Sequence, residues 1–61
     1  MDCVAAFGNL RLYRTDENYN LAWVKHDEDY KIVSRETIDT FPLTLQGQGE
    51  AITALWHRGT N

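Results

Sequence analysis

The sequence predicts an α+β fold in which a three- or four-stranded antiparallel meander carries one C-terminal helix on one face. Extended runs rich in Val, Leu, Ile and aromatic residues alternate with short acidic turns over most of the chain. The last segment instead separates polar from apolar residues at the helical period. With 61 residues, the chain has room for one small domain, residues 1–61.

Turn signals bound each expected strand. Gly8 and Asn9 interrupt the first apolar run and predict a bulge or bend there. Acidic turns separate the later runs, and Pro42 favours a strand start or an edge position. The expected extended segments are 4–14, with its regular part at 10–14, then 19–26, 30–37 and 41–45.

Residues 49–58 are expected to form the helix. At 100° per residue, Glu50, Thr53 and His57 lie on one side, and the apolar residues cover the other. Trp56 belongs to the apolar side and is therefore expected to pack on the sheet.

Residues 46–49, Gln-Gly-Gln-Gly, are expected to form a flexible linker before this helix. The alternative fold is an all-β, five-stranded small barrel in which residues 51–58 form the last strand. That alternative separates polar from apolar positions less well, so the helix is preferred.

Composition limits the class of protein. Six Lys and Arg against nine Asp and Glu give a net charge of −3, which lacks the overall basicity of a typical DNA-binding protein. No apolar run approaches the length of a membrane span, and no secretory signal is evident. The single cysteine, Cys3, cannot form an internal disulfide, so a cytoplasmic location is expected.

So small a chain buries only about 60% of the surface that its unfolded state exposes. Without a disulfide to stabilise it, the chain is expected to gain stability by docking on a partner or by forming a homodimer.

Charge divides between strands and turns. If even-numbered strand residues share one core face, the odd-numbered ones form a basic, aromatic patch on the other. The expected core face contains Leu10, Leu12, Ala22, Val24, Tyr30 and Ile32. The expected opposite face contains Val33 and the six candidate partner-binding residues Arg11, Tyr13, Trp23, Lys25, Lys31 and Arg35.

The acidic turn Asp27, Glu28 and Asp29 is a second candidate surface, which would steer a partner electrostatically. The structural alternative is that these residues are acidic only because hairpin turns favour polar residues. The neighbouring His26 does not complete a metal site with these carboxylates, and no nucleophile and base pair is visible. The sequence therefore predicts no metal, no cofactor and no enzyme activity.

The sequence-based hypothesis is a non-enzymatic binding module, a small accessory or phage-type regulatory or inhibitory protein that acts by protein–protein interaction. Trp23 and Tyr13 would anchor the partner, and the four cations would surround them. The alternative is a nucleic-acid-binding protein that uses the same sheet face, with its aromatic rings stacked on bases. Strands followed by one helix are similar in layout to the AP2-type and integrase arm-binding DNA modules, but no motif of those families is present.

Overall fold

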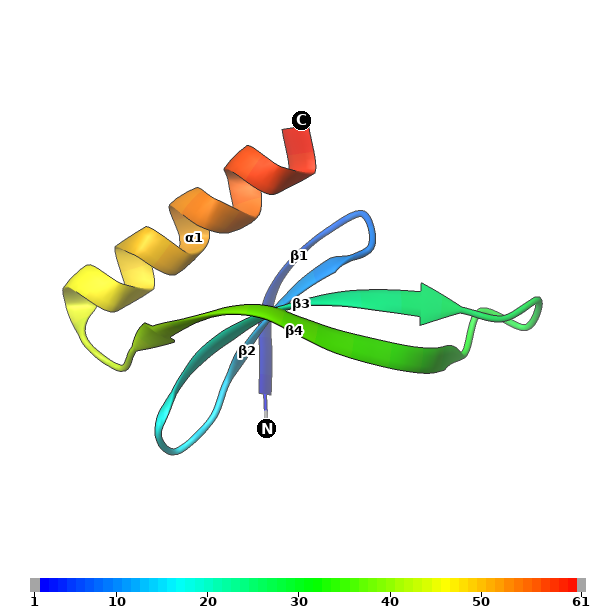
Figure 1. Cartoon of the computed structure of the whole chain (residues 1–61), viewed down its shortest axis with the longest axis horizontal. Helices are drawn as coiled ribbons and strands as arrows, with labels where there is room; N and C mark the ends of the chain where they lie inside the picture. The colour runs from blue at the N-terminus through cyan, green and yellow to red at the C-terminus, as the bar shows by residue number, and fades with distance from the viewer. Residues whose placement is uncertain (1, 61) are drawn as a thin grey trace.

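The computed structural model describes residues 2–60, which form four strands and one helix. All neighbouring strands are antiparallel and follow the chain order β1-β2-β3-β4, so β1 and β4 are the two edges of an open sheet (Figure 1). The elements are β1 (Asp2–Phe7), β2 (Leu10–Arg14), β3 (Asn18–His26), β4 (Ile32–Pro42) and α1 (Leu45–Thr60). The predicted meander with a C-terminal helix is confirmed.

The register between β2 and β3 decides which side chains share a face. Leu12 lies opposite Leu21, and Arg11 lies opposite Ala22, so even-numbered residues of β2 share a face with odd-numbered residues of β3. The cause is the turn: the Thr15 N–H donates to the Asn18 carbonyl at 2.9 Å, which leaves a two-residue loop between them. The expectation that even-numbered residues of successive strands share one face is therefore wrong.

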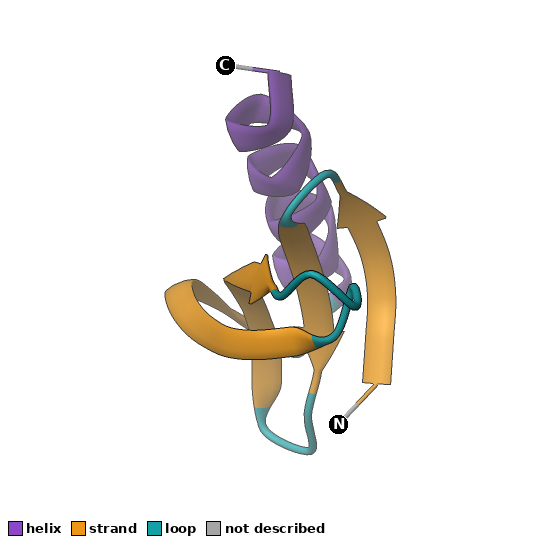
Figure 2. Cartoon of the chain, turned by 90° about the vertical axis from the view of Figure 1, so that its right-hand side faces the viewer, coloured by secondary structure: helices purple, strands orange, loops and turns teal. Residues whose placement is uncertain are grey.

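The core lies between one face of the sheet and the helix (Figure 2). Its buried members are Leu10, Leu12, Tyr19, Leu21, Ala51 and Leu55, with Ala5, Ile38, Phe41 and Ala54 packed against them. Leu10 and Leu12 occupy the core as predicted. Tyr30 and Ile32 do not, because 88% and 49% of their surfaces are exposed.

The helix begins at Leu45, four residues earlier than expected, so residues 46–49 are its first turn and not a linker. Thr44 caps it: the Thr44 hydroxyl accepts the Gly47 N–H at 2.9 Å, and the Thr44 carbonyl accepts the Gln48 N–H at 2.8 Å. The first bond satisfies one of the donors that a helix N-terminus leaves unpaired, and the second is the first regular hydrogen bond of the helix. Consequently the expected strand at 41–45 is reduced to the end of β4 at Pro42.

Small residues let the helix approach the sheet closely. Gly47, Ala51 and Leu55 recur every fourth position and are the buried residues of α1. A Cβ atom at Gly47 would overlap the Pro42 carbonyl, and one at Gly59 would overlap the Phe7 ring. Because this narrow stripe faces the sheet, Trp56 lies on the helix flank with 60% of its surface exposed, and its predicted packing on the sheet is wrong.

Replacing Gly47 should therefore destabilise the fold. We expect Gly47→Ala to lower the free energy of unfolding by about 1 to 3 kcal/mol, because the added methyl group must displace backbone. Gly49→Ala is the matched control: its Cβ meets nothing within 4 Å, so helix propensity should raise stability by about 1 kcal/mol. Urea unfolding followed by circular dichroism measures both. Equal effects of the two substitutions would contradict the close approach.

Candidate partner-binding surface

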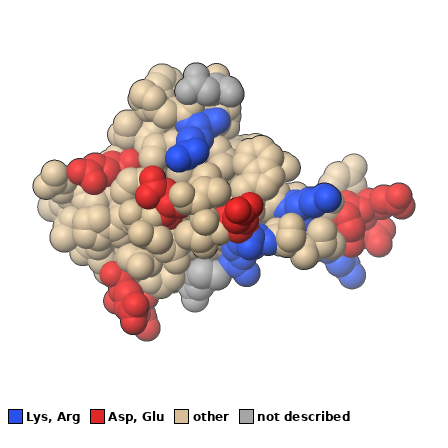
Figure 3. Space-filling view, viewed as in Figure 1, with Lys and Arg blue, Asp and Glu red and all other residues tan. Residues whose placement is uncertain are grey.

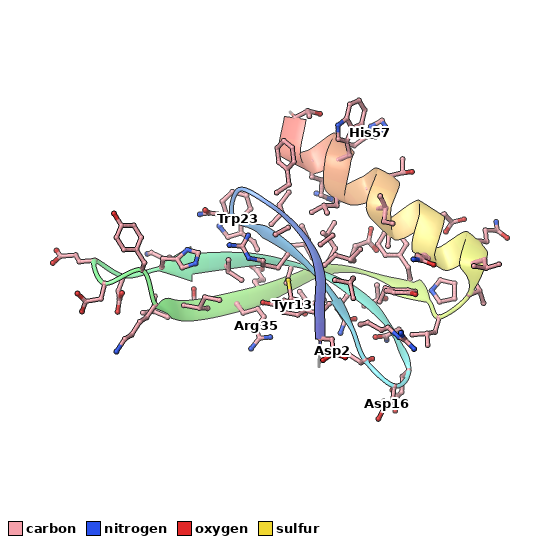
Figure 4. All side chains as sticks on the ribbon, turned by 180° about the vertical axis from the view of Figure 1, so that it is seen from behind. Asp2, Tyr13, Asp16, Trp23, Arg35 and His57 are labelled. Atoms are coloured by element: carbon pink, nitrogen blue, oxygen red, sulfur yellow. The ribbon has the colours of Figure 1, made fainter. Side chains whose placement is uncertain are left out.

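The six candidate partner-binding residues do not form one patch. Arg11 and Tyr13 lie opposite Ala22 and Asn20, on the sheet face that points away from the helix. Arg35, opposite Val24, joins that face. By contrast, Trp23 lies opposite Leu10 and so shares the helix side, as Figure 4 shows, and Lys25 follows it there at a spacing of two residues. Lys31 lies in the turn before β4.

A small second core occupies the face away from the helix. Ala22 and Val24 are completely buried there, and Tyr13 is 8% exposed. The Arg35 guanidinium lies 4.8 Å from the centre of the Tyr13 ring, a cation–π contact that spans β3 (Figure 4). Arg11 turns back to the chain, where its Nη1 donates to the carbonyls of Gly8 and Leu10. Tyr13, Arg11 and Arg35 thus make contacts within the fold, and Tyr13 is too buried to anchor a partner.

This geometry predicts that Arg35 stabilises the fold. Arg35→Ala should cost about 1 to 2 kcal/mol, because it removes both the cation–π contact and the packing of the long side chain. Lys25→Ala, at an exposed position of the neighbouring strand, should change stability by less than about 0.5 kcal/mol. Thermal unfolding of the two variants measures the difference. A loss no larger for Arg35→Ala than for Lys25→Ala would contradict the proposed role.

The end of β3, the start of β4 and the turn between them project from the body as a two-stranded arm, which we define as residues 25–34 (Figure 1). The last pair between β2 and β3 is Leu10 with Trp23. Beyond it, the Val24 N–H still donates to the Asn9 carbonyl at 2.8 Å. The arm lengthens the molecule: its Cα radius of gyration is 11.4 Å, against about 10.5 Å for a compact chain of this length.

Asp27 organises the tip of the arm. Its Oδ1 accepts the N–H groups of Asp29 at 2.9 Å and Lys31 at 3.0 Å. Its backbone N–H donates to the Lys31 carbonyl, and its carbonyl accepts the Tyr30 N–H. Tyr30 adopts a positive φ of 62° in this turn and is almost fully exposed. The carboxylate of Asp27 is therefore committed to the turn, while Glu28 and Asp29 remain exposed beside it.

Large apolar side chains are exposed along this arm and at its base. Trp23 is 49% exposed at the base, and Ile32 and Val33 are 49% and 57% exposed on the returning strand. Charges of both signs surround them, with carboxylates clustered at the tip (Figure 3). Tyr30 and Ile32 were expected in the core, so their exposure on the arm was not predicted from the sequence. The acidic turn directly before them was the available signal that both lie at a hairpin end.

The described residues offer no metal centre: within 2–60, no three His, Cys, Asp or Glu side chains are grouped closely enough to hold an ion. One polar surface hollow of about 430 Å³ is lined by Asp2, Arg14, Thr15, Asp16 and Leu43. Over the same residues, α1 is the single helix, and it is neither long nor apolar enough to span a membrane.

The fold and surface define a four-stranded antiparallel meander with one capping helix and a projecting two-stranded arm. No protein-family model, curated protein or solved structure matches the chain significantly.

Proposed function

We propose that this chain is a non-enzymatic binding module whose arm docks on another protein. One observation carries the proposal: the arm and its base expose Trp23, Tyr30, Ile32 and Val33, and none of residues 25–34 is buried. An isolated two-stranded hairpin is only marginally stable in water. A partner that covers these side chains would stabilise the arm and bury its apolar surface.

The charge of the arm favours a protein over a nucleic acid. Lys25 and Lys31 are balanced by Asp27, Glu28 and Asp29 within the same hairpin. Three carboxylates at the tip would repel a phosphate backbone, whose neutralisation dominates binding to nucleic acids. The expected basic face is also divided between the two sides of the sheet, which weakens the nucleic-acid alternative.

The partner surface that fits is an apolar recess with charges of both signs at its rim. Trp23 would enter the recess, because a partly exposed indole beside charged residues is the usual composition of an interface hot spot. Glu28 and Asp29 would steer the approach, and Lys25 and Lys31 would contact acidic groups at the rim. Such a module regulates or inhibits its partner by covering a surface, and it needs no cofactor.

Photo-crosslinking in the cells that express the protein tests the proposal. A benzoylphenylalanine placed at Tyr30 should give one discrete protein adduct, and the same group at His57 on the helix should not. Trp23→Ala should reduce that adduct at least about tenfold, the effect of losing a hot-spot residue of about 1.4 kcal/mol or more. Its circular dichroism should match that of the parent protein, because Trp23 is outside the buried core.

Two controls separate the alternatives. Nuclease treatment that removes the Tyr30 adduct, or an affinity that falls with a salt slope of about 0.9 per phosphate contacted, would transfer the function to nucleic-acid binding. Unfolding of Trp23→Ala would instead show that Trp23 belongs to the core.

Reversing the exposed charges at the tip tests electrostatic steering. With the captured partner, Glu28→Lys combined with Asp29→Lys should lower the association rate more than it raises the dissociation rate. An unchanged association rate would remove the steering role.

A further inference from the structure

After its first residue, Asp2, the β1 edge of the sheet is apolar. Residues 3–7, Cys-Val-Ala-Ala-Phe, carry no charge and no proline. In natural proteins, charged residues, proline or a covering element usually protect an edge strand from pairing with another strand. The opposite edge, β4, has this protection in Arg35, Glu36 and Asp39 and in two irregularities of register, whereas β1 has one irregularity, at Val4, and no charge after Asp2. The two edges are therefore not equivalent, and β1 is the one open to another strand.

The backbone of β1 has groups available for that pairing. The Thr15 to Asn18 and Val24 to Asn9 bonds show that odd-numbered residues of β2 point their backbone groups toward β3. Leu10 and Leu12 therefore point theirs toward Phe7 and Ala5, their partners in β1. Ala6, which lies between those two, directs its N–H and C=O outward at the edge.

One flank of the helix extends this apolar edge. Gly59 lies directly against the Phe7 ring, which places that flank of α1 on the β1 side. At 100° per residue, Ile52 and Trp56 fall within about 60° of Gly59 on the same flank. Ile52 is 48% exposed and Trp56 is 60% exposed, beside Phe7 at 43% and Val4 at 50%. We define the β1 surface as the exposed apolar side chains of this edge strand and of the helix flank that adjoins Phe7, namely Val4, Phe7, Ile52 and Trp56.

We propose that the β1 surface binds a second copy of this chain through antiparallel pairing of the two β1 strands. Within the regularly paired part of β1, residues 5–7, Ala6 is the residue that directs both backbone groups outward, and outward-pointing residues pair with each other. Ala6 then lies opposite Ala6 of the second copy. Phe7 lies opposite Ala5 of the second copy, so a large side chain meets a small one on both sides of the two-fold axis. The strand is thus self-complementary in shape, and the pair joins two sheets into one of eight strands.

The area of the β1 surface agrees with what a dimer needs. With roughly 200 Å² for a large apolar residue, the four exposed fractions correspond to about 400 Å² per copy. Complete burial of these side chains in two copies would cover about 800 Å² of apolar surface, the non-polar share of an interface near the lower end of the standard range of roughly 1,200–2,000 Å². This surface is separate from the arm, so the inference does not depend on the proposed function.

Sedimentation equilibrium over a concentration series tests the dimer with the full chain. We expect a concentration-dependent dimer, and Val4→Lys should raise its dissociation constant at least about tenfold, since it puts a charge into an apolar interface. Val33→Lys is the matched control, at a similarly exposed valine on the other edge strand. It should leave the dimer unchanged while weakening attachment of the arm to its partner. Circular dichroism confirms that both variants fold.

The single cysteine reports the geometry. A spin label on Cys3 should lie about 20 Å from its counterpart across the paired β1 strands, whereas pairing through β4 would place the two labels about 34 Å apart. A chain that stays monomeric up to about 1 mM would overturn the inference. So would a dimer that Val33→Lys dissociates and Val4→Lys does not. Neither result would alter the crosslinks expected at Tyr30, so failure of the dimer and failure of the proposed function are distinguishable.

Discussion

The register between β2 and β3 is the constraint on which the rest of this structure depends. It places Leu10, Leu12 and Leu21 on one face, where the helix covers them. A shift by one residue would move the whole apolar set of one strand to the opposite face. The same register sends Tyr13 and Ala22 to the other face and Trp23 to the helix side. The turn between β2 and β3 therefore decides that Tyr13 is buried on one face of the sheet while Trp23 is exposed on the other.

Close packing of the helix has a second consequence for the surface. A helix that contacts the sheet through Gly47, Ala51 and Gly59 lies near the strands but buries few large side chains of its own. Only Leu55 fills the space that a wider apolar face would occupy. Ile52 and Trp56 are left on the flank, so the molecule keeps apolar surface for contacts with other chains. In so small a domain, the close helix contact and the open apolar flank arise together.

The sequence predicted the meander and its C-terminal helix, because turn signals and periodicity are local properties. It did not predict that Gly8 and Asn9 form a hairpin turn between β1 and β2, or that the runs 30–37 and 41–45 belong to one strand, β4. The strands at 10–14 and 19–26 and the C-terminal helix are confirmed. The face of the sheet that each strand residue occupies could not be predicted. One residue added to or removed from a turn, or a bulge such as that near Val4, moves every following side chain to the opposite face without a clear local signal. The early start of the helix was missed because Gln-Gly-Gln-Gly suggests flexibility. Its cap depends on Thr44, and the need for glycine at position 47 appears only when Pro42 lies against it.

For the same reason, the exposure of single candidate residues was predictable but their arrangement on the sheet was not. Trp23 is exposed as expected, and Lys25, Lys31 and the acidic turn lie on the same hairpin. Tyr13 belongs instead to the small second core, where Arg35 crosses β3 to reach its ring, and Arg11 bonds to the backbone of its own hairpin. That contact joins residues from two strands that do not pair with each other, so no sequence spacing indicates it.

Cross-strand nuclear Overhauser effects between Hα protons measure the β2/β3 register directly. In the register described, Leu12 and Leu21 form a pair without mutual hydrogen bonds, in which the two Cα atoms are about 4.5 Å apart. A strong Hα contact between Leu12 and Leu21, with a second between Leu10 and Trp23, is the expected result. A strong contact from Leu12 to Ala22 would instead return Trp23 to the face of Arg11 and Tyr13, and would contradict the account of both surfaces.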